Sequence, residues 1–433
     1  MTPEDAEVAD VAEVVVVGAG PAGLAAAAAL EDRGVRRVLV VDRDDAAGGL
    51  PRFCNHPGFG WEYTHRLDSG PGLVRRLLER LDRNVVTIAT RTSVLAVRMA
   101  NETGPEPGPE LEIVGADCGH MRIRPRAVVL ATGIRERPRS ARLVPGRRPT
   151  QGILTTGQLQ QMVARGVPVN GQRAVVVGTE HVAFSILLTA RHAGFDVVAM
   201  VGAEDRIMSY AGMALVARAM GMTIHLSSTV DDIGGVERVE SVTLRGPSGR
   251  RSIACDTVIF SGDFIPDAAL LQGSGIDIAA TTCGPSIDQY GRTSAAGIFA
   301  AGNMLRAVES SGLAAIEGAR VGANAAAYVG GKGEGPFAWP REAANIRLGN
   351  GLSYIVPQCW VSPDVHGHAT RALPVSLRAR MDFRRARLCL SEDGRDIWTG
   401  PPTNILRHRR LALPAAALDQ LRGGAIALRI DPI

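Results

Sequence analysis

The chain has few cysteines, and none of the six lies close to another along its 433 residues. They stand at positions 54, 118, 255, 283, 359 and 389, without a C-x-x-C or C-x-x-x-x-C pair. This spacing argues against an iron–sulfur cluster, a structural zinc or a redox-active dithiol built from neighbouring ligands, and we predict no metal site. Scattered cysteines fit a reducing compartment, so we expect a cytoplasmic protein.

An excess of charge of either sign is also absent. The formal net charge is +4 at pH 7, which is small for this length and points to neither a nucleic acid nor a membrane surface as partner. Residues 1–7 lack the basic and apolar regions of a secretory signal. The uncharged stretch 14–30 is punctuated by Gly and Pro like a nucleotide-binding turn, so we expect no membrane insertion.

The most informative stretch covers residues 14–25, where an apolar run breaks into glycines spaced G-x-G-x-x-G and resumes rich in alanine. This pattern predicts a strand, a phosphate-binding turn and a helix. Gly18 would allow the tight turn, Gly20 the approach of a pyrophosphate, and Gly23 the packing of helix on strand. The second strand ends in Asp42, about 20 residues further on, where an acid can accept from a ribose hydroxyl. We therefore predict a dinucleotide site.

The same order of elements then occurs a second time. Short alternating strands between residues 92 and 124 lead to an apolar strand that closes the first unit at 127–133. A strand enters a second glycine turn at Gly178, a helix follows over 182–193, and an apolar strand closes the second unit at 257–262. The repeat predicts an α/β protein with two Rossmann-like three-layer nucleotide-binding domains, the second inserted in the first.

The chain returns to the first domain through an apolar strand that ends at Gly302 and Asn303. Open α/β sheets bind ligands at the carboxyl ends of their strands, so we expect Asn303 and the helix that begins near Ser311 to face one crevice.

The tail from about residue 339 alternates with period two, which predicts a small β-rich C-terminal module. Asp393-Gly394 is typical of a hairpin turn. One strand face would carry Leu377, Ala379, Met381 and Phe383, and the other Arg378, Arg380 and Asp382. The arginines of residues 407–410 could contact an acidic partner or lie on a solvated strand face.

These patterns divide the chain into five parts. We predict a flexible N-terminus over 1–11, a first nucleotide-binding domain over 12–147 and 265–330, an inserted degenerate domain over 148–264, a linker over 331–338 and the β-rich module over 339–433.

On these motifs the chain resembles the two-dinucleotide-binding-domain flavoproteins, the family of thioredoxin reductase and the pyridine nucleotide–disulfide oxidoreductases. In that family the first domain binds FAD and the second NAD(P)H. The segments 49–60, 131–138 and 262–266 look closest to FAD subunits of multi-component dehydrogenases and oxidases of the opine oxidase, hydroxyproline dehydrogenase and hydrogen cyanide synthase type. Such subunits work with a second flavoprotein and often with an iron–sulfur protein.

The resemblance implies a set of FAD-binding residues. Asp42 would hold the adenosine ribose, and Val94 would offer its backbone to the adenine. Asn303 replaces the family's usual aspartate at the ribityl chain and keeps an acceptor oxygen without the charge. The helix near Gly312 would direct its positive end at the flavin pyrimidine ring. The remaining contacts would come from Gly18, Gly20, Pro21, Ala22, Gly23, Arg43, Gly49, Leu50, Ala131, Thr132, Gly133 and Gly302.

The second glycine turn departs from the family pattern. Glu180 replaces its middle glycine, and a carboxylate there opposes a pyrophosphate both sterically and electrostatically. The following strand ends at Gly202 without an acid for an NAD ribose. These residues disfavour NAD(P)H binding at the second turn but do not exclude it.

Two residues near the predicted flavin are candidate catalytic groups. Cys54 could be a flavin-adjacent thiol or a small core residue. His56 could act as an acid–base or hydrogen-bond partner, or be structural.

Three functions stay open at this point. The chain could be an FAD-dependent, electron-transferring subunit of a multi-component amine or hydroxy-acid dehydrogenase or oxidase, acting on a small-molecule substrate. It could instead be a self-sufficient NAD(P)H-dependent flavin oxidoreductase, or an FAD-retaining assembly scaffold without its own catalysis.

Overall fold

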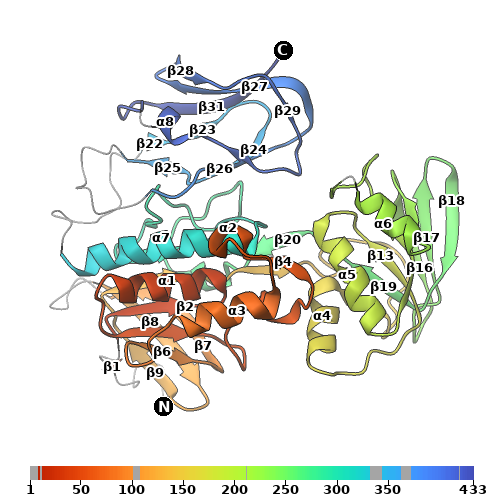
Figure 1. Cartoon of the computed structure of the whole chain (residues 1–433), viewed down its shortest axis with the longest axis horizontal. Helices are drawn as coiled ribbons and strands as arrows, with labels where there is room; N and C mark the ends of the chain where they lie inside the picture. Colours follow the sequence, from red (N-terminus) through yellow and green to blue (C-terminus); the bar gives the residue numbers. More distant parts are fainter. Residues whose placement is uncertain are drawn as a thin grey trace.

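The computed structural model describes residues 8–9, 12–100, 108–210, 212–331, 344–361, 372–418 and 420–433. Figure 1 shows the inserted domain, in yellow and green, beside the first domain, and the C-terminal module, in blue, above helix α7. Most of the predicted N-terminal segment 1–11 and of the linker 331–338 lies outside the described residues. Within the former, strand β1 (Val8–Ala9) pairs in parallel with β9 (Gly119–Ile123).

The first domain is built on a five-stranded parallel sheet whose strands are mostly fully buried valines, leucines and alanines. Both faces of such a sheet must be covered, which explains its continuous apolar runs. Helices α1 (Pro21–Asp32), α3 (Gly70–Glu79) and α7 (Ser311–Val329) share its core with an antiparallel sheet. That sheet contains β7 (Thr92–Met99), β8 (Pro109–Gly115) and β9. The parallel strands are, in spatial order, β21 (Ile298–Ala300), β10 (Ala127–Leu130), β2 (Val14–Val17), β3 (Val38–Val41) and β6 (Val86–Ala89).

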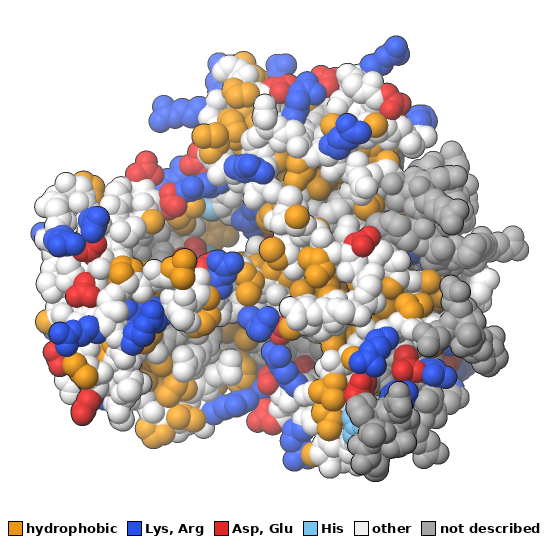
Figure 2. Space-filling model, turned by 180° about the vertical axis from the view of Figure 1, so that it is seen from behind, with side chains coloured by type: hydrophobic (Ala, Val, Ile, Leu, Met, Phe, Trp, Pro, Cys, Tyr) orange, Lys and Arg blue, Asp and Glu red, His pale blue; other side chains and the backbone are white. Residues whose placement is uncertain are grey.

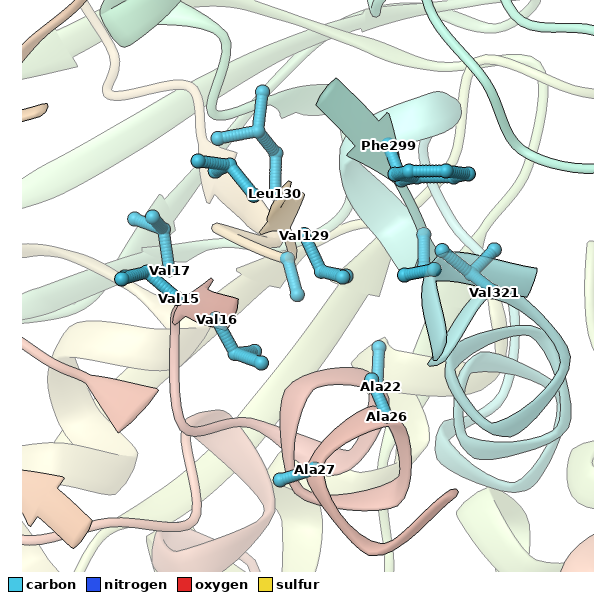
Figure 3. Packing of buried hydrophobic residues seen from close by; sticks show 14 of the residues in the cluster. Val15, Val16, Val17, Ala22, Ala26, Ala27, Val129, Leu130, Phe299 and Val321 are labelled. Carbon is cyan, nitrogen blue, oxygen red and sulfur yellow. The ribbon is translucent and has the colours of Figure 1, made fainter. Parts of the chain in front are cut away.

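Helices α1 and α7 pack against each other with almost no side chain between them. A Cβ atom on Gly318 would lie 1.9 Å from the carbonyl oxygen of Ala22, and one on Gly322 would lie 2.3 Å from that of Ala26. Figure 3 shows Ala22 and Ala26 of α1 near Val321 of α7, beneath the buried strands. The small residues therefore allow backbone contact between two helices that lie almost 300 residues apart in the sequence.

The inserted domain repeats this three-layer plan. Helices α4 (Thr156–Ala164), α5 (His181–His192) and α6 (Met213–Ala219) pack on one face of its parallel sheet. The antiparallel strands β16 (Thr229–Gly234), β17 (Ser241–Gly246) and β18 (Gly249–Ala254) pack on the other. The two domains are joined by β11 (Ile134–Glu136) and β20 (Phe264–Pro266), which pair antiparallel. The parallel strands are β12 (Ile153–Thr155), β19 (Thr257–Phe260), β13 (Arg173–Val177), β14 (Asp196–Val201) and β15 (Thr223–His225).

The C-terminal module is β-rich, as predicted, and has its own core around Leu377, Leu390 and Leu428. The residues Asp393 and Gly394 have φ values of 49° and 79° and connect β27 (Phe383–Glu392) to β28 (Arg395–Thr399), which confirms the predicted hairpin. Met381 was predicted to share a strand face with Leu377 and Ala379, which are buried, but it is 58% exposed, because β26 (Ser376–Ala379) ends before it. One sheet holds β23 (Arg347–Leu348), β31 (Ile426–Pro432), β27 (Phe383–Glu392) and β28 (Arg395–Thr399), and another β24 (Leu352–Val356), β26 (Ser376–Ala379) and β30 (Leu411–Ala412).

The module makes ion pairs with the inserted domain. Asp382 pairs with Arg206, and Arg407 pairs with Glu204. Arg407 therefore meets an acid within this chain. Among the described residues, no helix combines the length and apolar composition needed to cross a bilayer.

We predict that Gly318→Ala destabilises the fold. In an exposed helix interior this change would stabilise by about 1 kcal/mol. Here the added methyl group would overlap the Ala22 carbonyl oxygen, and overpacking of this kind costs about 1–3 kcal/mol. Urea denaturation should show a lower midpoint, and a midpoint at or above that of the wild type would contradict the close contact of α1 and α7.

Candidate functional site

A cavity of about 680 Å³ opens at the carboxyl ends of the first domain's strands. It runs from the turn after β2 to the N-terminus of α7, and its far wall comes from α4 and α5 of the inserted domain. Most of the predicted cofactor-binding residues line it, together with Cys54 and His56: Gly18, Gly20, Pro21, Ala22, Asp42, Arg43, Gly49, Leu50, Val94, Ala131, Thr132, Gly133 and Asn303.

The three glycines of the first turn have three different surroundings. Gly18 has a φ of +106°, and its Cβ would lie 2.4 Å from the Ala131 carbonyl oxygen. Gly23 lies against Gly18, because a Cβ on Gly23 would lie 1.8 Å from the Gly18 carbonyl oxygen. Gly20 has an ordinary φ of −76°, and a Cβ there would meet no atom within 4 Å. Open space therefore lies beside Gly20, at the N-terminus of α1, where a pyrophosphate fits.

Asp42 follows β3 at the edge of the cavity, and backbone amides fix the direction of its carboxylate. One oxygen accepts from Ala19 N at 2.7 Å, and the other accepts from Asp44 N at 2.9 Å. The neighbouring Arg43 is 65% exposed and donates to Asp267 at 3.1 Å. Carboxylate oxygens keep further lone pairs, so this acid can still accept from a ribose hydroxyl.

Asn303 lies in the 3-10 turn η4 (Gly302–Leu305) and holds the loop that leads to α7. Its Oδ1 accepts from Glu309 N and its Nδ2 donates to Glu309 O, both at 3.0 Å. Each end of the amide is thus engaged within the chain, and Oδ1 keeps one lone pair for a hydroxyl. Thr132 on the other side of the cavity donates to Asp267 O at 2.7 Å.

Three predicted site residues, including Gly23, do not line the cavity and instead allow close packing behind it. A Cβ on Gly302 would lie 2.6 Å from the Ala22 Cβ. One on Gly312 would lie 2.3 Å from Oε2 of Glu62, whose Oε1 accepts from the Ser310 hydroxyl at 2.7 Å. The positive end of α7 is therefore met partly by Glu62 of helix α2 (Trp61–Thr64).

The environment of Cys54 favours a neutral thiol. Its sulfur is buried and lies 3.6 Å from both Leu50 O and Gln160 Oε1. Burial raises the pKa of this thiol to about 12, so it carries a proton at neutral pH. His56 places Nδ1 3.1 Å from Pro57 O and packs its ring 5.1 Å from that of Phe59.

Sequence reasoning did not select the residues that the inserted domain contributes to the cavity. His181, the first residue of α5, lines it with Gln160 and Ser185. Burial and the nearby His56 lower the pKa of His181. The repeat could have identified this residue, because it follows the second glycine turn as Pro21 follows the first.

The second glycine turn is filled by its own side chain. A Cβ on Gly178 would lie 2.7 Å from a carboxylate oxygen of Glu180, and the Ser261 hydroxyl donates to that carboxylate. Arg142 donates to the carbonyl oxygens of Ser261 and Gly262 at 2.8 and 2.7 Å, which closes the same edge of the sheet. The Glu180 carboxylate thus lies against the glycine turn.

A second acid stands near this turn. Glu136 is buried beside Glu180, and burial raises its pKa despite a 2.8 Å hydrogen bond from Gly157 N. The charge of Glu180 contributes to this rise, because it disfavours a second negative charge nearby, as it would disfavour a phosphate.

Comparison with known proteins agrees with these observations. Residues 12–321 match the family described as pyridine nucleotide-disulphide oxidoreductase. The chain belongs to this family. It is an FAD-dependent oxidoreductase, and the predicted α/β fold class with two Rossmann-like domains is confirmed.

Two curated relatives are components of oxidases. An opine oxidase subunit of Agrobacterium tumefaciens (strain Ach5) is 26% identical over 350 residues, which cover 74% of this chain and 65% of that protein. The alpha subunit of sarcosine oxidase from Corynebacterium sp. (strain U-96) is 28% identical over 269 residues, which cover 59% of this chain and 26% of that protein. The chain therefore spans less than two thirds of the length of these relatives.

Solved structures agree on the fold. Thioredoxin reductase of T. acidophilum aligns with a TM-score of 0.59 at 19% identity and covers 73% of this chain and 97% of its own. L-proline dehydrogenase of P. horikoshii aligns with a TM-score of 0.51 at 20% identity, over 73% of this chain and 55% of its own.

We predict that Gly20→Val yields a folded protein without FAD. Its φ suits any residue and no protein atom is close, so the valine side chain would enter only the cavity. Gly212→Val is a matched control, because Gly212 also has open space but lies at the start of α6. Flavin absorbance per chain should fall at least tenfold in the first variant alone, with equal melting temperatures for both apoproteins. Unchanged flavin content in Gly20→Val would place the cofactor elsewhere.

Proposed function

We propose that this chain binds FAD in the cavity of the first domain and does not use NAD(P)H. The observation that carries this proposal is the contrast between its two glycine turns. The first turn leaves open space beside Gly20, whereas Glu180 fills the second with a carboxylate. Two copies of one fold thus offer a phosphate site and a phosphate-repelling site.

In this proposal each part of the cavity contacts one part of the cofactor. The pyrophosphate lies beside Gly20 at the N-terminus of α1, and Asp42 accepts from the adenosine ribose. Val94 lies at the adenine end, and Thr132, Gly133 and Asn303 line the ribityl path. FAD, when bound, supplies the electron transfer, while the chain orients it and sets the surrounding charge.

We further propose that the chain is an electron-transferring subunit of a multi-component amine or hydroxy-acid dehydrogenase or oxidase. The named relatives are subunits of opine and sarcosine oxidases, which supports a role beside partner subunits. From the family resemblance we expect a second flavoprotein as partner, with an iron–sulfur protein as a further component. Without pyridine nucleotide, electrons must come from a small-molecule substrate or from such a partner. All six cysteines are free thiols, which supports a cytoplasmic location.

We predict that neither NADH nor NADPH reduces the bound flavin of the purified chain under anaerobic conditions. Glu180→Gly should raise the NADH reduction rate at least tenfold, because a carboxylate about 4 Å from a phosphate costs about 1–4 kcal/mol. Glu180→Gln, which removes the charge and keeps the bulk, should fall between. Stopped-flow absorbance measures all three. Rapid reduction of the wild type by either nucleotide would instead support a self-sufficient NAD(P)H-dependent enzyme.

We predict that a second oxidase-like flavoprotein co-purifies with the tagged full chain from its source cells, in a fixed molar ratio. The amine or hydroxy-acid substrate of that complex should reduce the FAD of this chain, which anaerobic spectra of the complex would record. Recovery of the chain alone, or a flavin that stays oxidised in the complex with every substrate, would contradict its role as a subunit and favour a scaffold.

A further inference from the structure

The loop of residues 306–310 forms part of the cavity wall and leads into the N-terminus of α7. Val308, Glu309 and Ser310 line the cavity. On the inner side, Asn303 holds both the N–H and the carbonyl of Glu309. On the outer side, the loop meets the C-terminal module, which Figure 1 shows above α7.

Arg378 of β26 makes this outer contact. Its Nη2 donates to Glu309 Oε1 at 2.9 Å and to Val308 O at 3.3 Å. Its Nε donates to Tyr354 Oη at 3.2 Å, and its Nη1 donates to His408 O. The Arg378 side chain is 20% exposed and that of Glu309 is 6% exposed, so water screens the pair little. Arg378 thus joins the module to the cavity wall.

Glu309 relies mainly on the module for its neutralising charge. Its carboxylate accepts from Arg378 and, at 3.4 Å, from Ser376 Oγ, both on β26. Arg306 also interacts with Glu309, but it is 1% exposed and is engaged by Glu317, with Nη1 2.8 Å from Oε2. Loss of Arg378 would therefore leave a largely buried carboxylate beside the cavity.

We propose that Arg378 is a positioning residue through which the C-terminal module sets the reduction potential of the flavin. This inference rests on the proposed FAD site, with the flavin ring toward the α7 end of the cavity. A flavin gains negative charge when it is reduced, so an unneutralised carboxylate nearby disfavours reduction. Arg378 keeps Glu309 neutralised and its loop in place. Figure 2 shows basic and acidic side chains interspersed on the face opposite to that of Figure 1.

The test compares midpoint potentials of purified, FAD-loaded full-length variants. Arg378→Met should lower the potential, and Glu309→Gln, which keeps the shape of the side chain, should raise it. A tenfold change in the affinity ratio of reduced and oxidised FAD is about 30 mV for a two-electron couple, and we expect at least that shift in each direction. The double variant should return close to the wild type, and Arg378→Lys should recover most of the loss.

Arg429→Met is the matched control. It removes a more exposed arginine of the same module, whose partners Asp396 and Asp431 lie away from the cavity. Its potential should equal that of the wild type, although its melting temperature can fall. The FAD dissociation constant should rise at least tenfold for Arg378→Met and stay unchanged for the control.

Two results would overturn the inference. Equal potentials in wild type, Arg378→Met and Glu309→Gln would show that the pair does not act on the flavin. Shifts of the same size in Arg429→Met would show only a general effect of module stability. Either result leaves the FAD site intact, whereas a wild-type chain that binds no FAD would contradict the proposed function itself.

Discussion

The close contact of α1 with α7 is the constraint on which the site depends. Because Gly318 and Gly322 bring the α7 backbone against Ala22 and Ala26, the strand, turn and helix at the start of the chain meet a helix from residues 311–329. The same Ala22 touches Gly302, so η4 and its Asn303 are placed by this contact as well. One small-residue interface thus assembles both ends of the cavity from segments far apart in sequence.

The two nucleotide-binding folds of this chain show how little of a binding site is determined by topology. Both have a strand, a glycine turn and a helix in the same order, and both glycines that open the turns have positive φ. The difference that decides access to each turn lies at the middle position, Gly20 in the first and Glu180 in the second, where a side chain either is absent or fills the space. The inserted domain still contributes His181, Gln160 and Ser185 to the cavity.

Local patterns in the sequence predicted most of the fold. Glycine spacing, buried valine runs and the Asp393-Gly394 turn each depend on neighbouring residues, so the sequence contains their signal. The predicted strand face of Met381 was wrong, because alternation of apolar and polar residues does not reveal where a strand ends. The contacts of Glu62 with Gly312 and of Arg378 with Glu309 join segments from different parts of the chain, and only the assembled fold brings them together.

The Glu180 carboxylate can be regarded as a ligand of the second glycine turn that is covalently attached to it. A carboxylate on the turn itself is present at an effective concentration far above that of any free metabolite, since no translational freedom is lost when it takes its place. A nucleotide arriving from solution would have to break its bond with Ser261 and move it aside before its own phosphates could approach. In the proposed function the turn therefore keeps the shape of an anion site while its occupant is part of the polypeptide, and that occupancy would not vary with the metabolic state of the cell.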